Sequence, residues 1–201
     1  MTTPIGILLS GRGSNFLALH GAMERGEVPG HIAVVISNVA EAAGLEKARA
    51  LRLPTVCIPH RLEPSRVAHE AKVIEALHHA GAEWVCLAGY MRLLSASFVA
   101  EYPQRILNIH PALLPSFPGL DGQAQAVEYG VRVSGCTVHL VDEGLDSGPI
   151  VVQRVVPLKE GDTAESLSAR ILVEEHKAYP EALNALLSQR WNIVGRRLVM
   201  S

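Results

Sequence analysis

Short apolar runs alternate with helix-length segments along the first half of this chain, and this alternation is what most constrains the fold. Each run is short enough for a buried strand, and the segments between carry helical spacing or helix-capping residues. The expected strands are Ile5–Ser10, Ile32–Ser37, Thr55–Ile58, Trp84–Ala88 and Ile106–His110. Helices are expected over residues 16–23, 42–51, 64–79 and 95–102. Such alternation is typical of right-handed crossovers and a mostly parallel sheet.

The pattern changes after residue 110. A helix is expected over Gly122–Tyr129, but the β-rich runs Ser134–Val141 and Pro149–Pro157 have no helix-length segment between them. We therefore expect these runs to be two strands joined by the loop Asp142–Gly148. A long final helix is expected over residues 164–187, and a tail hairpin around Gly195.

Together these elements predict one α/β domain over residues 1–201. It is expected to be Rossmann-like, with a mostly parallel twisted sheet flanked by helices and an antiparallel extension in the C-terminal third. We expect residues 1–110 to form a phosphate-binding half, residues 111–188 a half with the catalytic loop, and residues 189–201 a tail. In the helix over 64–79, the spacing of Val67, Ala71, Ile74 and Leu77 predicts the buried face.

Composition argues against several kinds of partner. A net charge of −2 and an aromatic content of 4% give no reason to expect a nucleic acid. Three scattered cysteines without a C-x-x-C pattern, and nine histidines without an H-E-x-x-H pattern, predict no metal site and a reducing compartment. Because the apolar run Ile5–Leu9 is too short for a signal peptide or a membrane span, we expect a cytoplasmic protein with no membrane partner.

The turn Gly11–Asn15 lies between the first expected strand and the first expected helix. A helix N-terminus offers free backbone N–H groups and a positive dipole end, which suit a phosphate. A dinucleotide is disfavoured because Phe16 stands where the third glycine of that fingerprint belongs, and because the second strand ends in Ser37 and Asn38 rather than an acid. A plain tight turn remains the alternative.

The stretch Asn108–Gly119 carries the strongest candidates for chemistry. Strand periodicity places Asn108 and His110 on one face, and Pro111 holds His110 extended. Two polar residues that merely cap a strand end are the alternative. However, Gly11–Asn15, Gly89–Leu94 and Asn108–His110 all follow expected parallel strands, where ligands bind in such sheets.

Five stretches in this order resemble the phosphoribosylglycinamide formyltransferase family of folate-dependent enzymes. The similarity runs from Ile5 to about Leu187. The matching pieces are Gly11–Asn15, Ala88–Leu94, Asn108–Pro115, Gly135–His139 with Asp146, and Glu175–Pro180. The resemblance implies transfer of a formyl group from 10-formyltetrahydrofolate, as co-substrate, to the amine of glycinamide ribonucleotide in purine biosynthesis. It also implies that the half after residue 110 carries the folate site, and that the protein is a monomer or homodimer.

The resemblance also implies roles for particular residues. Asn108, His110 and Asp146 match the catalytic trio, in which Asn108 would steady the oxyanion, His110 would act as acid, and Asp146 would keep the imidazole charged. Gly13, Ser14 and Asn15 match the phosphate loop, and Glu175 matches a residue near the glycinamide end. Folate-lining positions are matched by Arg66, Met91, Arg92, Leu93, Leu94 and Asn108. The chain departs from some members at Leu172, where they have a polar residue near the substrate.

Three other functional hypotheses are compatible with the sequence. One is another folate-dependent formyltransferase and another is a formyltetrahydrofolate hydrolase, since both share the Asn-X-His and Asp trio. The third is a non-catalytic phosphate-binding sensor, which would use Gly11–Asn15 but would not need Asn108, His110 and Asp146.

Overall fold

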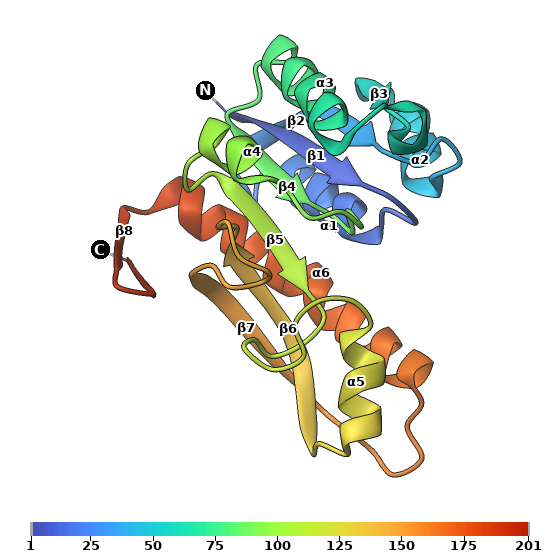
Figure 1. The fold of residues 1–201 in the computed structure, drawn as a ribbon. Coiled ribbons are helices and arrows are strands. Elements are labelled where there is room, and N and C mark those ends of the chain that lie inside the picture. The colour runs from blue at the N-terminus through green and yellow to red at the C-terminus, as the bar shows by residue number, and fades with distance from the viewer. Residues whose placement is uncertain (1, 201) are drawn as a thin grey trace.

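A nine-stranded sheet runs through residues 2–200, the part of the chain that the computed structural model describes (Figure 1). Its strands are β1 (Thr3–Leu9), β2 (Gly30–Ser37), β3 (Thr55–Cys57), β4 (Trp84–Leu87), β5 (Ile106–His110), β6 (Val133–Leu140), β7 (Ile150–Pro157), β8 (Trp191–Val194) and β9 (Arg197–Met200). In space they follow the order β3-β2-β1-β4-β5-β6-β7-β9-β8. The neighbours from β3 to β5 pair in parallel, whereas β6 runs antiparallel to both β5 and β7.

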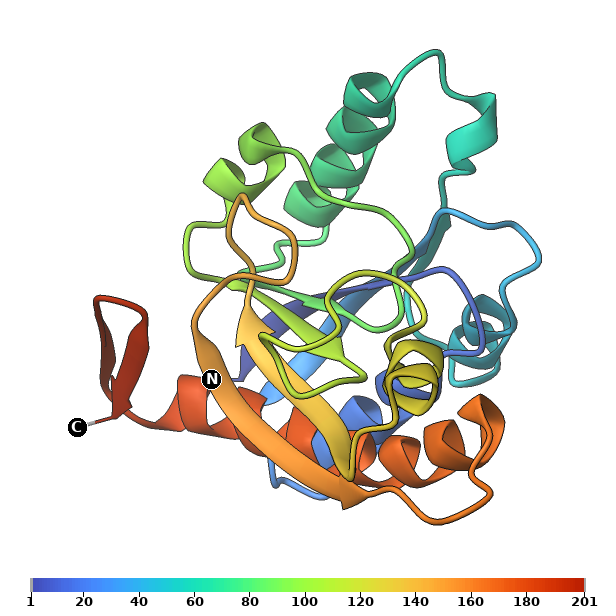
Figure 2. The ribbon, with the colours of Figure 1, turned by 60° about the horizontal axis from the view of Figure 1, so that its bottom comes forward.

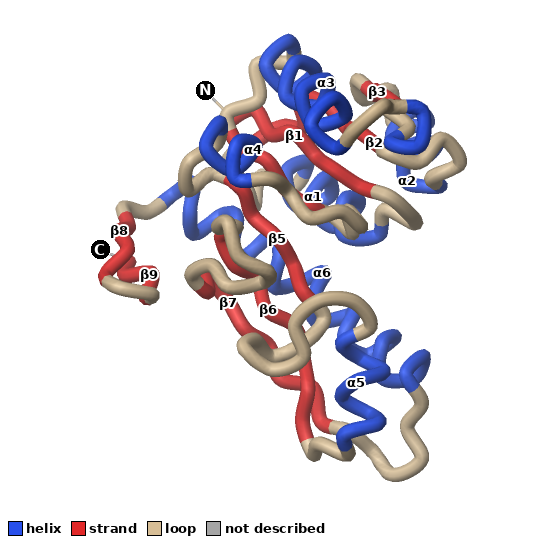
Figure 3. Tube along the Cα trace, viewed as in Figure 1, coloured by secondary structure: helices blue, strands red, loops and turns tan. Residues whose placement is uncertain are grey.

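Helices lie on both sides of this sheet (Figures 2 and 3). They are α1 (Ser14–Glu24), α2 (Ala43–Ala50), α3 (Arg66–His79), α4 (Ala96–Glu101), α5 (Gly122–Tyr129) and α6 (Ala164–Ser188), with a short 3₁₀ turn at His60–Leu62. On one face, Phe16 of α1 and Leu183 of α6 share a core with Leu107 of β5. On the other, Leu77 of α3 and Phe98 of α4 form a second core. Both faces of the central parallel strands are therefore buried, as expected where helical crossovers join such strands.

This architecture confirms the predicted α/β class, the mostly parallel sheet and the antiparallel extension near the C-terminus. The tail forms the hairpin of β8 and β9 around Gly195, as predicted. The division into halves near residue 110 stays a prediction, since one continuous sheet crosses it through the pairing of β5 with β6. Within residues 2–200, no helix is both long and apolar enough to cross a membrane.

The predicted buried face of α3 is partly wrong. Val67 is 70% exposed and Ala71 is also exposed, while Val73 is buried and Leu77 is buried as predicted. Two polar neighbours are buried with them, His69 and Glu70. Apolar spacing misses this face because polar residues that find partners on another segment can be buried as readily as valine.

Tyr179 fixes α6 against two central strands, β4 and β5. Its hydroxyl is fully buried and lies 3.0 Å from the carbonyl oxygen of Leu87 and 2.9 Å from that of Leu107. Since a tyrosine hydroxyl has one hydrogen, the two carbonyls share it. This contact sets the position of α6, and with it the position of Glu175 one turn earlier.

Candidate active site

Strand β5 presents Asn108 and His110 on one face of the sheet, as their spacing predicted. Leu107 and Ile109 point the other way, into the core beneath α1 and α6. His110, the last residue of the strand, is buried, whereas Asn108 in its middle is half-buried. The site therefore has a buried ring and a neighbouring amide that a small ligand can reach.

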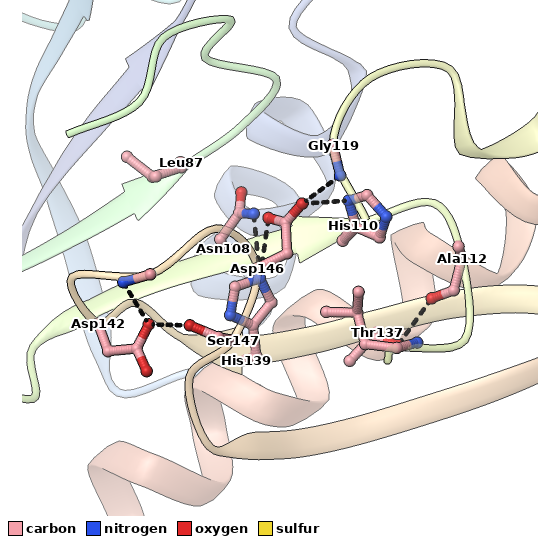
Figure 4. Close-up of polar contacts among 12 residues, drawn as sticks. Leu87, Asn108, His110, Ala112, Gly119, Thr137, His139, Asp142, Asp146 and Ser147 are labelled. Carbon is pink, nitrogen blue, oxygen red and sulfur yellow. Dashed lines mark hydrogen bonds and ion pairs between the residues drawn. The ribbon is translucent and has the colours of Figure 1, made fainter. Parts of the chain in front are cut away.

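Asp146 reaches this face from the loop that joins β6 to β7 (Figure 4). Its Oδ2 lies 3.4 Å from Nδ1 of His110 and accepts a hydrogen bond from the backbone N–H of Gly119 at 2.8 Å. Asp146 has a left-handed backbone with φ 47°, a conformation that aspartate tolerates better than most residues. The carboxylate thus ties its own loop to the loop that follows β5.

The imidazole of His110 faces an acceptor at each nitrogen. Nε2 lies 2.8 Å from the carbonyl oxygen of Phe117, and Nδ1 faces the Asp146 carboxylate. A carbonyl oxygen can only accept, so Nε2 carries a proton. A doubly protonated ring satisfies both partners, whereas a neutral ring would turn a lone pair toward the carboxylate.

His139 also lies in this site, although no role was predicted for it from the sequence. Nε2 of His139 is 3.2 Å from Nδ2 of Asn108 and 3.7 Å from Oδ1 of Asp146. His139 is 2% exposed, and burial lowers its pKa against the opposing effects of the hydrogen bond to Leu140 and the charge of Asp146. His139 belongs to one of the matched stretches, but a sequence does not show which residue of β5 it faces.

Asp142 holds the loop rather than the histidine. Its Oδ1 accepts from the N–H of Gly144 and from the hydroxyl of Ser147. These bonds close a tight turn that contains Asp146. The two aspartates of this loop are therefore distinguished by their partners.

The Gly11–Asn15 turn leads into α1, and its backbone packs closely against that of Gly44. Gly13 is the N-cap residue, has φ 71°, and makes no side-chain cap to the helix. A Cβ atom there would lie 2.6 Å from Cα of Gly44, and the N–H of Gly44 donates to the carbonyl of Gly11. Because the N-cap residue Gly13 has no side chain to accept from them, the first N–H groups of α1 can bind an anion.

Glu175 joins this turn from α6. Its Oε2 accepts from Nδ2 of Asn15 at 2.8 Å. Burial raises the pKa of Glu175, although the Asn15 hydrogen bond and the charge of Arg12 act in the opposite direction. Arg12 and Leu172 help to line a cavity of about 390 Å³ between the turn and the first part of α6.

The residues expected to line a folate site form a third group on the segment after β4. Met91 and Leu93 are 65% and 58% exposed, while Arg92 and Leu94 are half-buried. Arg66 of α3 forms an ion pair with Glu70, which in turn accepts from the backbone N–H of Ser95 at the end of this segment.

Ser10 connects this third group to the phosphate turn. Its hydroxyl accepts from the N–H of Met91 and its own N–H donates to the carbonyl of Gly89. The three predicted groups are therefore arranged along the ends of β1, β4 and β5. Within residues 2–200, no cluster of three or more His, Cys, Asp or Glu side chains is placed to hold a metal ion.

Comparison with known proteins places the chain in a family. Residues 4–183 match the formyl transferase family. The phosphoribosylglycinamide formyltransferase of Bacillus subtilis is 39% identical over 181 residues, which cover 90% of this chain and 93% of that protein. This chain belongs to the phosphoribosylglycinamide formyltransferase family.

A solved structure of this family agrees with the whole fold. The glycinamide ribonucleotide transformylase 1 of Symbiobacterium toebii superposes with a TM-score of 0.97 and 49% identity, over 99% of this chain and 94% of that one. A human relative, trifunctional purine biosynthetic protein adenosine-3, is 45% identical over 184 residues, which are 92% of this chain but 18% of that protein. The expected family and the expected class of enzyme, a formyltransferase, are confirmed.

Proposed function

We propose that this member of the family transfers the formyl group of 10-formyltetrahydrofolate to the amine of glycinamide ribonucleotide, giving formylglycinamide ribonucleotide in de novo purine biosynthesis. The observation that carries the proposal is the meeting of Asp146 with His110, beside Asn108, at the end of β5. Curated relatives with this activity in their names, such as the Bacillus subtilis enzyme, support it. A phosphate sensor would need only the Gly11–Asn15 turn.

The reaction makes three chemical demands. The amine attacks the formyl carbon, so a carbon–nitrogen bond forms and negative charge develops on the formyl oxygen. The bond from that carbon to the folate N10 then breaks. One proton leaves the attacking amine and one reaches N10, so the overall reaction is balanced without a redox partner or a covalent enzyme intermediate.

We assign these demands to the trio. An N–H of Asn108 donates to the developing oxyanion, an effect worth about 3–4 kcal/mol where comparable donors have been removed. His110 supplies the proton for N10, for which general acids contribute ~10²–10⁴-fold. Asp146 keeps the ring protonated and takes up the proton from the amine through water.

The carbonyl of Phe117 has a consequence for this mechanism. It accepts the Nε2 proton of His110 at 2.8 Å, so this donor already has a partner within the protein. We infer that the bound formyl-folate displaces this carbonyl and receives the hydrogen bond instead.

The remaining predicted residues would bind the two substrates. We assign the ribonucleotide phosphate to Gly13, Ser14 and Asn15, where α1 begins, and its glycinamide end to Glu175. The folate would lie against the segment after β4 and reach the trio. Its proposed contacts are Arg66, Met91, Arg92, Leu93, Leu94 and Asn108.

Assembly and location also remain proposals. We propose a monomer or homodimer without nucleic acid, membrane or metal. The three cysteines are free thiols, which supports the proposed cytoplasmic location.

A single assay tests the activity against its rivals. The purified chain is mixed with 10-formyltetrahydrofolate, and the absorbance of released tetrahydrofolate is followed with glycinamide ribonucleotide, with its phosphate-free riboside, and without any amine. The proposal expects release that depends on the ribonucleotide and is much weaker with the riboside. Release without an amine would indicate a hydrolase, and no release under any condition would leave only a binding protein.

A further inference from the structure

His139 is the one buried histidine in contact with both Asn108 and Asp146, among the residues that the structure describes. Strand pairing explains the contact. In the antiparallel register of β5 and β6, Asn108 lies directly opposite His139, so both side chains leave the sheet on the same face. Figure 4 shows the amide of Asn108 above the ring of His139, with the carboxylate of Asp146 beside it.

The tautomer of His139 follows from its backbone contact. Nδ1 lies 2.9 Å from the carbonyl oxygen of Leu140, which can only accept, so Nδ1 carries a hydrogen. The ring is 2% exposed and burial lowers its pKa, so the neutral form prevails at neutral pH. The other nitrogen, Nε2, is then a bare acceptor.

A bare acceptor at Nε2 determines which end of the Asn108 amide faces it. The amide nitrogen can donate across the 3.2 Å separation. If the amide were turned over, its oxygen would meet the Nε2 lone pair, which already faces Oδ1 of Asp146 at 3.7 Å. The amide oxygen of Asn108 and Oδ1 of Asp146 would then both face the bare Nε2 of His139, and none of these three atoms could donate a hydrogen bond.

We propose that His139 is a positioning residue for the reaction, which turns the Asn108 amide so that its nitrogen faces the site. One N–H of Asn108 donates to Nε2 of His139, and the second N–H is left to donate to the formyl oxyanion. This inference rests on the proposed function, because it assigns His139 a task in that same chemistry. His139 itself does not touch the reacting atoms.

The hydrogen bond can be tested without turnover. In protein carrying ¹⁵N-labelled histidine, two-bond ¹H–¹⁵N spectra at pH 7.5 report which ring nitrogens are protonated, and comparison with the His139→Gln variant assigns the signal among the nine histidines. The inference expects Nδ1 protonated and Nε2 bare. A ring protonated at Nε2, with or without Nδ1, overturns it.

Kinetics then test what the contact does. His139→Phe keeps a flat ring but removes the acceptor, and is expected to lower kcat at least ~10-fold while both KM values stay within ~3-fold, because a misdirected donor is lost mainly in the transition state. His139→Gln places an amide oxygen near the same point and is expected to recover most of the rate. His79→Gln, on the exposed side of α3, is the matched control and should leave kcat unchanged.

A double mutant separates positioning from general support of the fold. In an Asn108→Ala background there is no amide to direct, so His139→Phe should change kcat less than ~2-fold. An equal loss in both backgrounds overturns the inference, as does an unchanged kcat in His139→Phe alone. If the phenylalanine variant does not fold, the glutamine variant in both backgrounds and the ring spectrum still decide. Failure of the parent protein to transfer formyl would instead reject the proposed function.

Discussion

Asn15 and Glu175 are 160 residues apart in the chain and share a hydrogen bond of 2.8 Å between Nδ2 and Oε2. Asn15 was expected at the phosphate end of the ribonucleotide and Glu175 at its glycinamide end. Their hydrogen bond joins the start of α1 to the middle of α6, so the two proposed ends of the substrate site are in direct contact. The oxygen of the Asn15 amide is buried without a hydrogen-bond partner, which leaves an acceptor that a ligand can use.

Replacement of Asn15 by leucine should weaken binding of the ribonucleotide. The change removes side-chain bonding beside the phosphate turn and leaves the Glu175 carboxylate without its donor. Since a hydrogen bond to a charged group is worth about 1.5–3 kcal/mol, we expect the KM for the ribonucleotide to rise ~10–100-fold. The folate KM should change little in the same steady-state measurements. Asn192→Leu, on the exposed edge of β8, is the control, and a selective rise in the folate KM would assign the turn to the wrong ligand.

Glu175→Gln should change how stability depends on pH. Burial raises the pKa of Glu175, so the folded state holds this proton more tightly than the unfolded state does. The group's contribution to stability is therefore greatest at low pH and is lost as pH rises through the ordinary carboxyl pKa toward the raised value. The glutamine variant lacks this loss, and its amide can still accept from Asn15.

The measurement is the melting temperature of both proteins from acidic to alkaline pH. We expect the Tm of Glu175→Gln minus that of the parent to increase with pH across this range and then level off. Glu160→Gln, at an exposed site, should give a flat difference. A difference that decreases with pH would mean that the carboxylate form is the favoured one in the folded protein.

Asp146→Asn should slow the reaction while leaving the loop in place. An amide oxygen can still accept from the N–H of Gly119, but it carries no charge to hold the His110 ring protonated. We expect kcat to fall at least ~10²-fold, within the range for a lost acid or base, with both substrates bound almost normally. Asp142→Asn is the matched comparison and should cost less than ~3-fold, because the replacement can still accept from Gly144 and Ser147. Equal losses in the two variants would reject the assignment of Asp146.

The strands and helices could be predicted from the sequence because the patterns that indicate them are local. Apolar runs gave the strands from β1 to β5, and Ser95 and Thr163 cap the helices that follow them, each accepting a backbone N–H two or three residues into its helix. The antiparallel pair β6 and β7 was also accessible, because no segment between them is long enough for a crossover.

The site could not be predicted from the sequence wherever it depends on strand register or on a partner distant in the chain. Which residue of β5 His139 faces is set by the pairing of two strands, and one sequence carries no measure of that register. The choice between Asp142 and Asp146 likewise depends on how the loop folds back. The buried face of α3 was mispredicted for a related reason: Glu70 is stabilised there by Ser95, 25 residues further along the chain.

Glu70 holds the end of the proposed folate segment in place through Ser95. Its buried carboxylate accepts from Nε of Arg66, from the N–H of Ser95 and from the hydroxyl of Ser95, which also caps α4. Glu70→Ala removes all three bonds and leaves the half-buried Ser95 N–H without its acceptor, at a cost toward the lower end of the ~1–3 kcal/mol typical of an unpaired buried group. We expect a lower Tm and a folate KM raised several-fold, with the ribonucleotide KM unchanged. Glu70→Gln keeps one acceptor and should fall between alanine and the parent.

Asn15→Leu is expected to raise only the ribonucleotide KM, whereas Glu70→Ala is expected to raise only the folate KM. Steady-state kinetics on the two variants therefore test independently which of the two segments binds which substrate. A rise in both KM values for Glu70→Ala would show that the contact supports the whole sheet edge through Ser10 rather than the folate segment alone.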